Sequence, residues 1–232
     1  MKLFELMSDM ADIFWPRICH GCGRALLRGE EHLCIHCFVE LPRAALVQGP
    51  EHPLQKLFRG RIDLYQADAW LFFRKKGISQ QLMHALKYHG DQDLGTYLGR
   101  MYGKELKNRS DFIIPDLITS VPLHQSKLKR RGFNQSDLIA AGIAESLNIP
   151  FRPGLLYRLD DNASQTRKKR YERWENASDT YQVVQTGTDL PRHIALIDDV
   201  ITTGSTVEAC AGKLKSAGVP EISVFAICLA IN

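Results

Sequence analysis

Two adjacent acids and a run of small hydroxyl-bearing residues near the C-terminus have the types and order that binding a phosphorylated sugar requires. Asp198 and Asp199 follow the apolar run 194–197, which predicts a buried strand, and 206–217 predicts the next helix. The turn between them contains Thr202, Thr203, Gly204, Ser205 and Thr206. Hydroxyls, backbone N–H groups and the positive end of a helix bind phosphate, and carboxylates accept hydrogen bonds from the vicinal hydroxyls of ribose. We therefore predict a ribose-phosphate-binding loop at the carboxyl end of this strand, where α/β folds bind ligands.

Gly204 is expected to let the backbone of this loop approach the ligand closely. Two other interpretations stay open. The loop could be a plain strand–turn–helix capped by threonine, although two consecutive acids at the exposed end of a buried strand fit that poorly. It could also hold an acid–base dyad of Asp198 and Asp199, although adjacent strand residues point in different directions. P-loop and G-x-G-x-x-G motifs are absent from the sequence, which argues against ATPase and dinucleotide-binding functions.

Four of the six cysteines form two C-x-x-C pairs, Cys19 with Cys22 and Cys34 with Cys37, separated by eleven residues. Each pair makes a knuckle that directs two thiolates at one point. Four thiolates complete a closed tetrahedral shell, so the pattern predicts a structural zinc site without an open position for catalysis. A redox dithiol pair and a site that has lost its metal are the alternatives. Three histidines of this segment could substitute as ligands: His20, His32 and His36.

The 232 residues are enough for one α/β domain of ordinary size and a small accessory module. Residues 1–15 have apolar positions at helical spacing and predict a short amphipathic helix that packs on its own protein or, less favoured, on a partner or membrane surface. The zinc module is expected over 16–42. Residues 43–60 contain several prolines and glycines without periodicity and are expected to be a linker. The main domain is expected over 61–232.

In the main domain, apolar segments alternate with helical ones, which predicts a mostly parallel sheet with helices on both faces. The polar and basic stretch 157–174 is expected to be a long mobile loop. The expected strands are 63–74, 117–121, 194–197 and 222–230, and the expected helices are 79–87, 94–106, 134–147 and 206–217.

Composition and charge restrict the class of protein. A hydrophobic fraction of 44% and a charged fraction of 24% are typical of a soluble globular protein. Apolar runs stay well below the roughly 18 residues of a membrane span, so no membrane span is expected. Acids interrupt the apolar residues of the N-terminal region, so no secretory signal is expected. The expected location is therefore the cytoplasm. Two basic clusters, 127–131 and 167–173, could be solvated faces or could bind nucleic acid. Tyr171 and Trp174 interleave with the second and offer stacking surfaces.

The stretch 194–206 resembles the signature with which type I phosphoribosyltransferases bind PRPP, the 1-pyrophosphate of ribose 5-phosphate. The resemblance implies that residues 202–206 hold the 5′-phosphate, that Asp198 and Asp199 bind the ribose hydroxyls, and that Mg²⁺ arrives with the pyrophosphate. The chain also resembles the ComF family over nearly its whole length. The resemblance lies in the order of four features: the cysteine module, the segments 85–91 and 121–135, and the stretch 158–176. The fold implied is the α/β type I phosphoribosyltransferase fold with an N-terminal four-cysteine zinc module.

Other residues gain roles from this resemblance. It places the pyrophosphate loop at Ser120, Val121 and Pro122, with Lys127 nearby. Lys87 and Tyr88 could line the base side of the site. Plain surface charge for Lys127 and Lys129, and a core position for Tyr88, are the alternatives. The resemblance also implies contacts to anionic substrate from two segments. The segment after the pyrophosphate loop supplies Arg130, Arg131 and Asn134. A mobile hood over 156–176 supplies Arg158, Gln165, Arg170 and Arg173.

The ComF family is associated with natural transformation or the use of extracellular DNA. The resemblance therefore implies PRPP and single-stranded DNA as ligands, and DNA-uptake or recombination machinery as candidate partners. Whether turnover occurs stays open: the chain is either a phosphoribosyltransferase with an unidentified acceptor or a non-catalytic module that senses PRPP. A phosphoribosyltransferase of nucleotide salvage is the remaining alternative, which consumption of a purine or pyrimidine with PRPP would identify.

Overall fold

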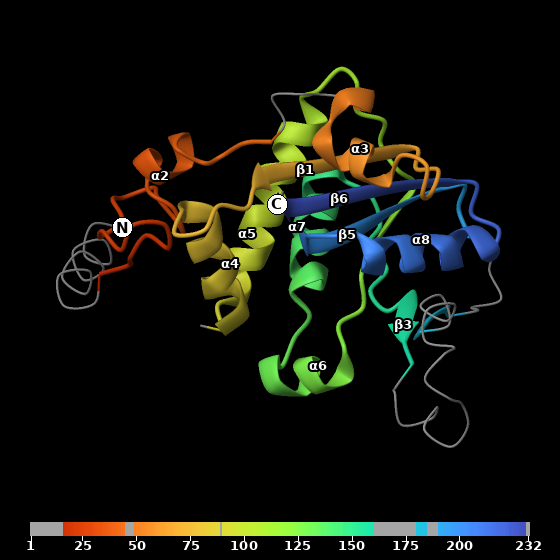
Figure 1. Ribbon diagram of the computed structural model, residues 1–232. Coiled ribbons are helices and arrows are strands. Elements are labelled where there is room, and N and C mark those ends of the chain that lie inside the picture. The colour runs from red at the N-terminus through yellow and green to blue at the C-terminus, as the bar shows by residue number, and fades with distance from the viewer. Residues whose placement is uncertain (1–15, 45–48, 89, 160–179, 185–189, 231–232) are drawn as a thin grey trace.

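Parallel strands form the central sheet of the computed structural model, which describes residues 16–44, 49–88, 90–159, 180–184 and 190–230 (Figure 1). Their order across the sheet is β1 (Gln66–Phe72), β6 (Glu221–Leu229), β5 (His193–Ile201) and β2 (Leu117–Ser120). Each pairing in this sheet is parallel, so the carboxyl ends of its strands lie at one edge.

Both faces of this sheet are buried, as the alternating side chains of β5 show. Ala195 and Ile197 belong to one hydrophobic core, whereas Ile194 and Leu196 belong to another on the opposite face. The result is the three-layer α/β architecture that the alternation of segments predicts. The first core is shared with α4 (Ile78–Tyr88), α5 (Gln92–Lys107) and α7 (Gln135–Leu147), and the second with α3 (Pro53–Phe58) and α8 (Ser205–Ser216).

Helices α5 and α7 touch along their backbones because both present glycine at the contact. A Cβ atom on Gly99 would lie 2.2 Å from the carbonyl oxygen of Ile139, and one on Gly142 would lie 2.2 Å from that of Thr96. Any larger residue at either position would force the helices apart. This close pair fixes the start of α7, which lies beside the carboxyl edge of the sheet.

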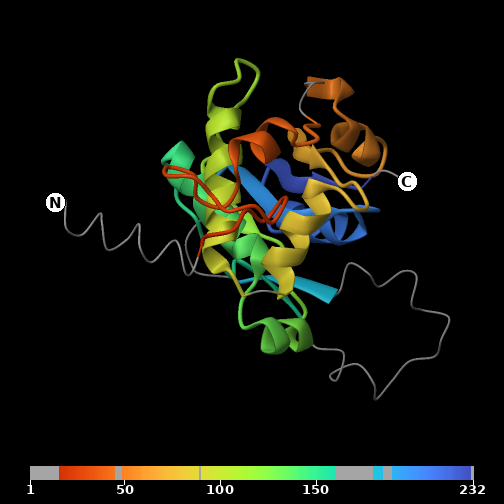
Figure 2. The same ribbon diagram turned by 90° about the vertical axis from the view of Figure 1, so that its left-hand side faces the viewer.

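The cysteine module is packed onto the first core and is not an independent appendage. Cys19, Leu33 and Cys37 are buried in the same hydrophobic cluster as α4 and α5. A Cβ on Gly21 would lie 3.2 Å from Cγ2 of Ile78, at the start of α4. Figures 1 and 2 both show the module, in red, beside α4 and α5.

Several short elements surround the domain. Helix α2 (Ile35–Val39) lies in the cysteine module and the 3₁₀ helix η1 (Gly49–Glu51) precedes α3. Helix α6 (Gln125–Arg131) follows β2. Strands β3 (Leu156–Arg158) and β4 (Tyr181–Val183) form an antiparallel ribbon, and Leu156 and Tyr181 join the core that contains α8.

The structure differs from the predicted elements in a few places. Strand β5 extends beyond the predicted end at 197, because β6 continues to pair with it through Ile201 opposite Leu229. Asp198 and Asp199 therefore lie on the strand and not in the turn. Strand β1 is shorter than 63–74 at both ends.

The segment 43–60, expected to be a linker, contains η1 and α3, and Leu54 and Phe58 of α3 are buried in the second core. The stretch 157–174 begins in β3, and its part from 160 onward lies outside the described residues, as do the predicted helix 1–15 and residues 231–232. Within the described ranges, no helix combines the length and apolar character needed to cross a membrane.

Candidate functional site

The strands that lead into the predicted pyrophosphate loop and the predicted phosphate turn are neighbours at the carboxyl edge of the sheet. Strands β2 and β5 are neighbours, with Ser120 opposite Ile197. The pairing continues one residue further, because the backbone N–H of Val121 donates to the carbonyl of Ile197 at 2.9 Å. The segment that begins at Ser120 thus leaves the sheet directly beside Asp198. Two segments far apart in the sequence therefore leave the sheet from neighbouring strands.

The two acids of the site have different partners. The carboxylate of Asp198 accepts hydrogen bonds from the hydroxyl of Ser136 at 3.1 Å and from the backbone N–H of Asp199 at 2.8 Å. Asp199 forms an ion pair with Lys87 at the end of α4, with 2.7 Å between Nζ and Oδ2. This separation of roles gives no support to the acid–base dyad.

Burial raises the pKa of Asp198 to about 7, and the neighbouring charge of Asp199 adds to this effect. The hydrogen bonds from Asp199 N–H and Ser136, and the more distant charge of Lys87, act in the opposite direction. No cation pairs directly with Asp198 among the residues that the structure describes. Its carboxylate therefore changes charge near neutral pH and has acceptor capacity left for a ligand.

The turn from Thr202 to Thr206 presents hydroxyls to solvent at the N-terminus of α8. Thr202, Thr203, Ser205 and Thr206 are exposed, and Gly204 is the buried N-cap residue. The hydroxyls of Thr203 and Ser205 lie 3.1 Å apart. Exposed hydroxyls around the first turn of a twelve-residue helix suit an anion.

Gly204 is required for packing, and the close approach of its backbone to a ligand stays a prediction. Its φ of +77° favours glycine, and a Cβ there would lie 2.7 Å from the ring of Phe58 on α3. Arg61 also holds this turn, because it donates to the carbonyl of Thr203 at 2.7 Å and pairs with Glu208 on α8. The glycine thus lets α3 approach the turn from the side of the protein.

Helix α7 supports the predicted pyrophosphate loop through Asp137, which no sequence pattern marked for this site, and through Asn134, which was expected to contact anionic substrate. Asp137 accepts hydrogen bonds from the hydroxyl of Ser120 and from the amide of Asn134 at 2.9 Å. Asn134 also donates to the carbonyl of Val121 at 3.1 Å and caps α7 by accepting from the N–H of Ser136 at 3.2 Å. Burial raises the pKa of Asp137, and its two hydrogen bonds oppose this. The Asn134 side chain is thereby engaged within the protein.

The basic segment after the pyrophosphate loop is helical. Lys127 and Arg130 of α6 are exposed and have no ion pair with another described residue. Arg131 donates to Gln135 at 2.8 Å, and its guanidinium lies 5.7 Å from the ring centroid of Tyr88. Tyr88 is 60% exposed, so it is not a core residue.

Arg158 lies beside the phosphate turn, at the end of β3. Its guanidinium is 5.7 Å from the ring centroid of Tyr181 on β4, and the Tyr181 hydroxyl is hydrogen-bonded to Thr206. Burial raises the pKa of Tyr181, which keeps its hydroxyl neutral. The other residues predicted for the hood lie outside the described residues: Gln165, Arg170 and Arg173.

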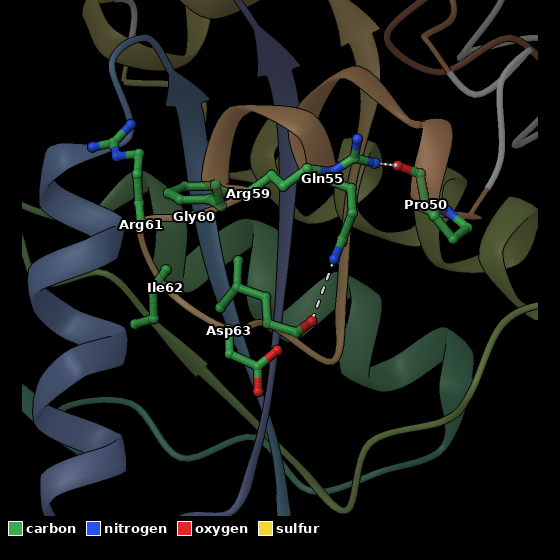
Figure 3. A pocket seen from close by; sticks show the side chains of 9 residues that line it. Pro50, Gln55, Arg59, Gly60, Arg61, Ile62 and Asp63 are labelled. Atoms are coloured by element: carbon green, nitrogen blue, oxygen red, sulfur yellow. Dashed lines mark hydrogen bonds between the residues drawn. The ribbon is translucent and has the colours of Figure 1, made fainter.

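A surface hollow of about 390 Å³ lies beside the turn, on the side of α3 (Figure 3). Gln55 spans it to the carbonyl of Leu64 at 3.3 Å, and Arg59 donates to the carbonyl of Pro50 at 3.1 Å. Figure 3 shows Arg61 at its rim pointing toward α8. Because Arg61 stands between this hollow and the turn, the hollow is not the place where the predicted phosphate would bind.

The four predicted zinc ligands converge. The Sγ atoms of Cys19, Cys22, Cys34 and Cys37 lie within 4.8 Å of one another, close enough for all four to bind one metal ion. The backbone N–H groups of Gly21 and Cys34 donate to the sulfur of Cys19 at 3.4 and 3.3 Å. Burial raises the pKa of Cys19, but these hydrogen bonds and one from Cys22 outweigh it and lower the value to about 7. The cluster could therefore bind a structural zinc ion.

Comparison with known proteins supports one family. No family model matches the chain. Among solved structures, it is similar to a glutamine PRPP amidotransferase from B. subtilis in complex with ADP and GMP, with 18% identity, coverage of 62% of this chain and 30% of that chain, and a TM-score of 0.44. An adenine phosphoribosyltransferase from Thermoanaerobacter pseudethanolicus is 19% identical, with coverage of 60% and 82% and a TM-score of 0.37.

Three relatives by sequence carry related names. The chain is 30% identical to DNA utilization protein YhgH of Escherichia coli O157:H7 over 222 residues, which cover 91% of this chain and 89% of that protein. It is 31% identical to Competence protein F of Haemophilus influenzae over 125 residues, 53% and 55% of the two chains. Competence protein ComFC of Streptococcus pneumoniae is 28% identical over 141 residues, 61% and 59% of the two chains. The chain therefore belongs to the ComF family.

Proposed function

We propose that this chain binds PRPP at the carboxyl edge of its sheet and acts in the utilization of DNA. The observation that carries the first part is that β2 and β5 are neighbours: the segment that begins at Ser120 leaves the sheet beside Asp198, on the strand that leads into the turn 202–206. The names of the relatives support the second part, because they include DNA utilization and competence proteins.

Each part of PRPP has a matching group. The 5′-phosphate binds the exposed hydroxyls of the turn and the first N–H groups of α8. Asp198 and Asp199 accept hydrogen bonds from the ribose hydroxyls, and this selects PRPP over inorganic phosphate. The pyrophosphate lies along Ser120 to Pro122, within reach of the basic α6. Mg²⁺ bound to the pyrophosphate neutralises part of its charge.

Lys87 and Arg158 complete this site from two other elements. Lys87 forms an ion pair with Asp199, whose carboxylate accepts hydrogen bonds from the sugar. Arg158 lies next to Thr206 through Tyr181 and adds positive charge beside the phosphate. The acceptor of the ribose phosphate is not defined by these groups, so transfer to an acceptor and non-catalytic sensing of PRPP are both compatible with the site.

Calorimetry with PRPP and Mg²⁺ tests the PRPP site. The double variant Asp198→Asn with Asp199→Asn should spare inorganic phosphate and weaken PRPP by roughly 2–4 kcal/mol, because charge-assisted hydrogen bonds are lost. The control is Asp63→Asn, since Asp63 is 98% exposed and lies outside the site. Equal PRPP affinity in parent and double variant, or no PRPP binding by the parent, would refute the site. Consumption of PRPP only with an added nucleobase or with DNA would identify the acceptor.

Helix α6 is the described surface that supports binding of single-stranded DNA. Lys127, Lys129 and Arg130 are exposed on it, next to the proposed pyrophosphate site. The second predicted basic cluster, 167–173, lies outside the described residues. Binding through phosphates makes affinity fall with salt, and each lost contact reduces the logarithmic salt slope by about 0.7 for a single strand.

The matching experiment replaces the three basic residues of α6 by glutamine and follows affinity for a fluorescent oligonucleotide against salt. The control removes the same charge from another surface, with Lys56, Arg59 and Lys215 changed to glutamine. The α6 variant should lose affinity and about two units of slope, whereas the control should retain both. Equal losses in the two variants would show that α6 does not bind DNA.

The cysteine cluster is proposed to hold one structural zinc ion. Elemental analysis of reduced protein should find it, and Cys22→Ser should release it and loosen the module. A chain that contains no zinc and keeps its fold after chelation would refute this assignment.

A further inference from the structure

A second cluster of metal-binding side chains lies at the junction between the cysteine module and the main domain. His20 and His32 come from the module, and Asp91 is the N-cap residue of α5. One ligand atom from each lies within 4.8 Å of the others. Neither the cysteine cluster nor the carboxyl edge of the sheet uses these side chains.

The two imidazoles converge on the same carboxylate oxygen. Nε2 of His20 lies 2.9 Å from Oδ2 of Asp91, and Nδ1 of His32 lies 3.4 Å from it. The other carboxylate oxygen, Oδ1, accepts the hydrogen bond from the N–H of Leu94 that caps α5 at 3.0 Å. The cap therefore fixes the carboxylate in the orientation that directs Oδ2 at both rings.

The histidines are also held in place by their neighbours. The backbone N–H of His20 donates to the carbonyl of His32 at 3.0 Å, so the two chain segments are joined beside the cluster. Their rings are stacked with centroids 5.6 Å apart, and the ring of His32 packs on Tyr97 at 5.1 Å. The three side chains are 17%, 18% and 27% exposed, so they are half-buried but still open to solvent on one side.

Two imidazole nitrogens and one carboxylate oxygen form a ligand set that binds Zn²⁺ or Fe²⁺ with coordination positions left for water. We infer that His20, His32 and Asp91 form a second, open site for a divalent transition metal, separate from the closed four-cysteine site. A metal there links the module to the turn between α4 and α5.

Titration of metal-free, reduced full-length chain with Co²⁺ tests this inference, because the two sites have different spectra. The four-cysteine site gives intense thiolate-to-metal charge-transfer bands, whereas the His–His–Asp site gives weak ligand-field bands only. We expect two equivalents to bind, one with charge-transfer bands and one without. The second equivalent should also raise the melting temperature of the chain.

His32→Phe retains the ring that packs on Tyr97 and removes the ligand, and Asp91→Asn retains the cap of α5. Both variants should bind one equivalent, with charge-transfer bands that show an intact cysteine cluster. His36→Phe is the matched control, since His36 lies exposed on α2 outside the cluster, and it should bind two. One equivalent in the parent would show that these side chains only hydrogen-bond to one another. Two equivalents in His32→Phe and Asp91→Asn would place the second metal elsewhere. Either result overturns the inference and leaves the PRPP proposal untouched.

Discussion

The two ends of the sheet each contain a carboxylate on a strand, in different surroundings. Asp68, near the amino end of β1, is 4% exposed and accepts hydrogen bonds from Tyr102 at 2.6 Å and Arg109 at 2.5 Å. Arg109 in turn binds both oxygens of Asp111 at 3.0 and 2.9 Å. At the other end, Asp198 on β5 has a hydroxyl and a backbone N–H as partners, and burial raises its pKa to about 7.

This contrast separates a structural carboxylate from one suited to a ligand. The charge of Asp68 is compensated by the half-buried guanidinium of Arg109, so its hydrogen-bonding capacity is used within the protein. The ionised form of Asp198 lacks such a partner, so hydrogen-bond donors of a ligand would stabilise it. Groups whose pKa is displaced by burial at the edge of a sheet are candidates for function, whereas saturated networks stabilise the fold.

Removing the cation at the amino end should have the largest effect on stability. Arg109→Met leaves Asp68 buried without its charged partner, so we expect the free energy of unfolding in urea to fall by about 3–5 kcal/mol. The control is Arg192→Met, because Arg192 pairs with Glu221 but is 76% exposed, and an exposed pair contributes about 0–1 kcal/mol. A loss for Arg109→Met as small as for Arg192→Met would contradict a structural role for this network.

The equivalent change at the carboxyl end should act on the ligand. Asp198→Asn removes one acceptor charge, and we expect PRPP affinity to fall by roughly 2–3 kcal/mol in calorimetry. The free energy of unfolding at pH 8 should stay equal or rise, because the variant no longer buries an uncompensated charge. A marked fall in the free energy of unfolding at pH 8 would show that Asp198, like Asp68, is a structural carboxylate.

The pH dependence of stability follows from the raised pKa of Asp198. The folded chain keeps this proton up to about pH 7, whereas an unfolded aspartate loses it near pH 4. The folded state therefore binds more protons between these values, and its stability falls as pH rises through this window, by an amount on the order of 1–4 kcal/mol. Urea unfolding at pH 5 and pH 8 measures this difference in the free energy of unfolding. Asp198→Asn should remove its contribution, whereas Asp63→Asn should not.

These results also define what the sequence could reveal. The cysteine pairs and the order of Asp198, Asp199 and Thr202 are local patterns, so spacing alone was sufficient to predict those clusters. The strands and long helices were predictable from their periodicity. Helix α3 was missed because its buried residues, Leu54 and Phe58, occupy only one turn, although Pro53 at its first position is a start signal.

Contacts between distant segments could not be derived from spacing. Ser136 reaches Asp198, and Asp137 holds Ser120, only because α7 begins beside the carboxyl ends of β2 and β5. The pattern from Asn134 to Asp137, a cap followed by an acid in the first turn, marks the start of α7 but not its target. The end of β5 was underestimated because acids rarely continue a buried strand, yet β6 supplies pairing for them.

A smaller effect on stability should distinguish packing from ligand contact at the phosphate turn. Gly204→Ala places a Cβ against Phe58 at a positive φ, so we expect a loss of about 1–3 kcal/mol in the free energy of unfolding. Combining it with Phe58→Leu should recover part of this loss, which a double-mutant cycle measures. PRPP affinity of the folded Gly204→Ala chain should change little. If Gly204→Ala instead lost all PRPP affinity and kept its normal free energy of unfolding, Gly204 would serve ligand binding and not packing.

The smallest effect should come from Lys87, and it tests whether the two acids of the carboxyl edge are linked. Lys87→Met breaks one partly buried ion pair, so the free energy of unfolding should fall by about 1–2 kcal/mol, between the values for exposed and buried pairs. The charge of Lys87 lowers the pKa of Asp198, so its removal should raise that pKa further. Because the sugar donates to an ionised carboxylate, PRPP affinity should then rise with pH through a higher midpoint than in the parent.

Two control variants belong to this test. Lys87→Arg keeps the charge and should restore the parental midpoint. Asp198→Asn should show only the pH dependence due to the phosphates of PRPP. An unchanged midpoint in Lys87→Met would mean that Lys87 interacts with Asp199 alone and does not influence Asp198.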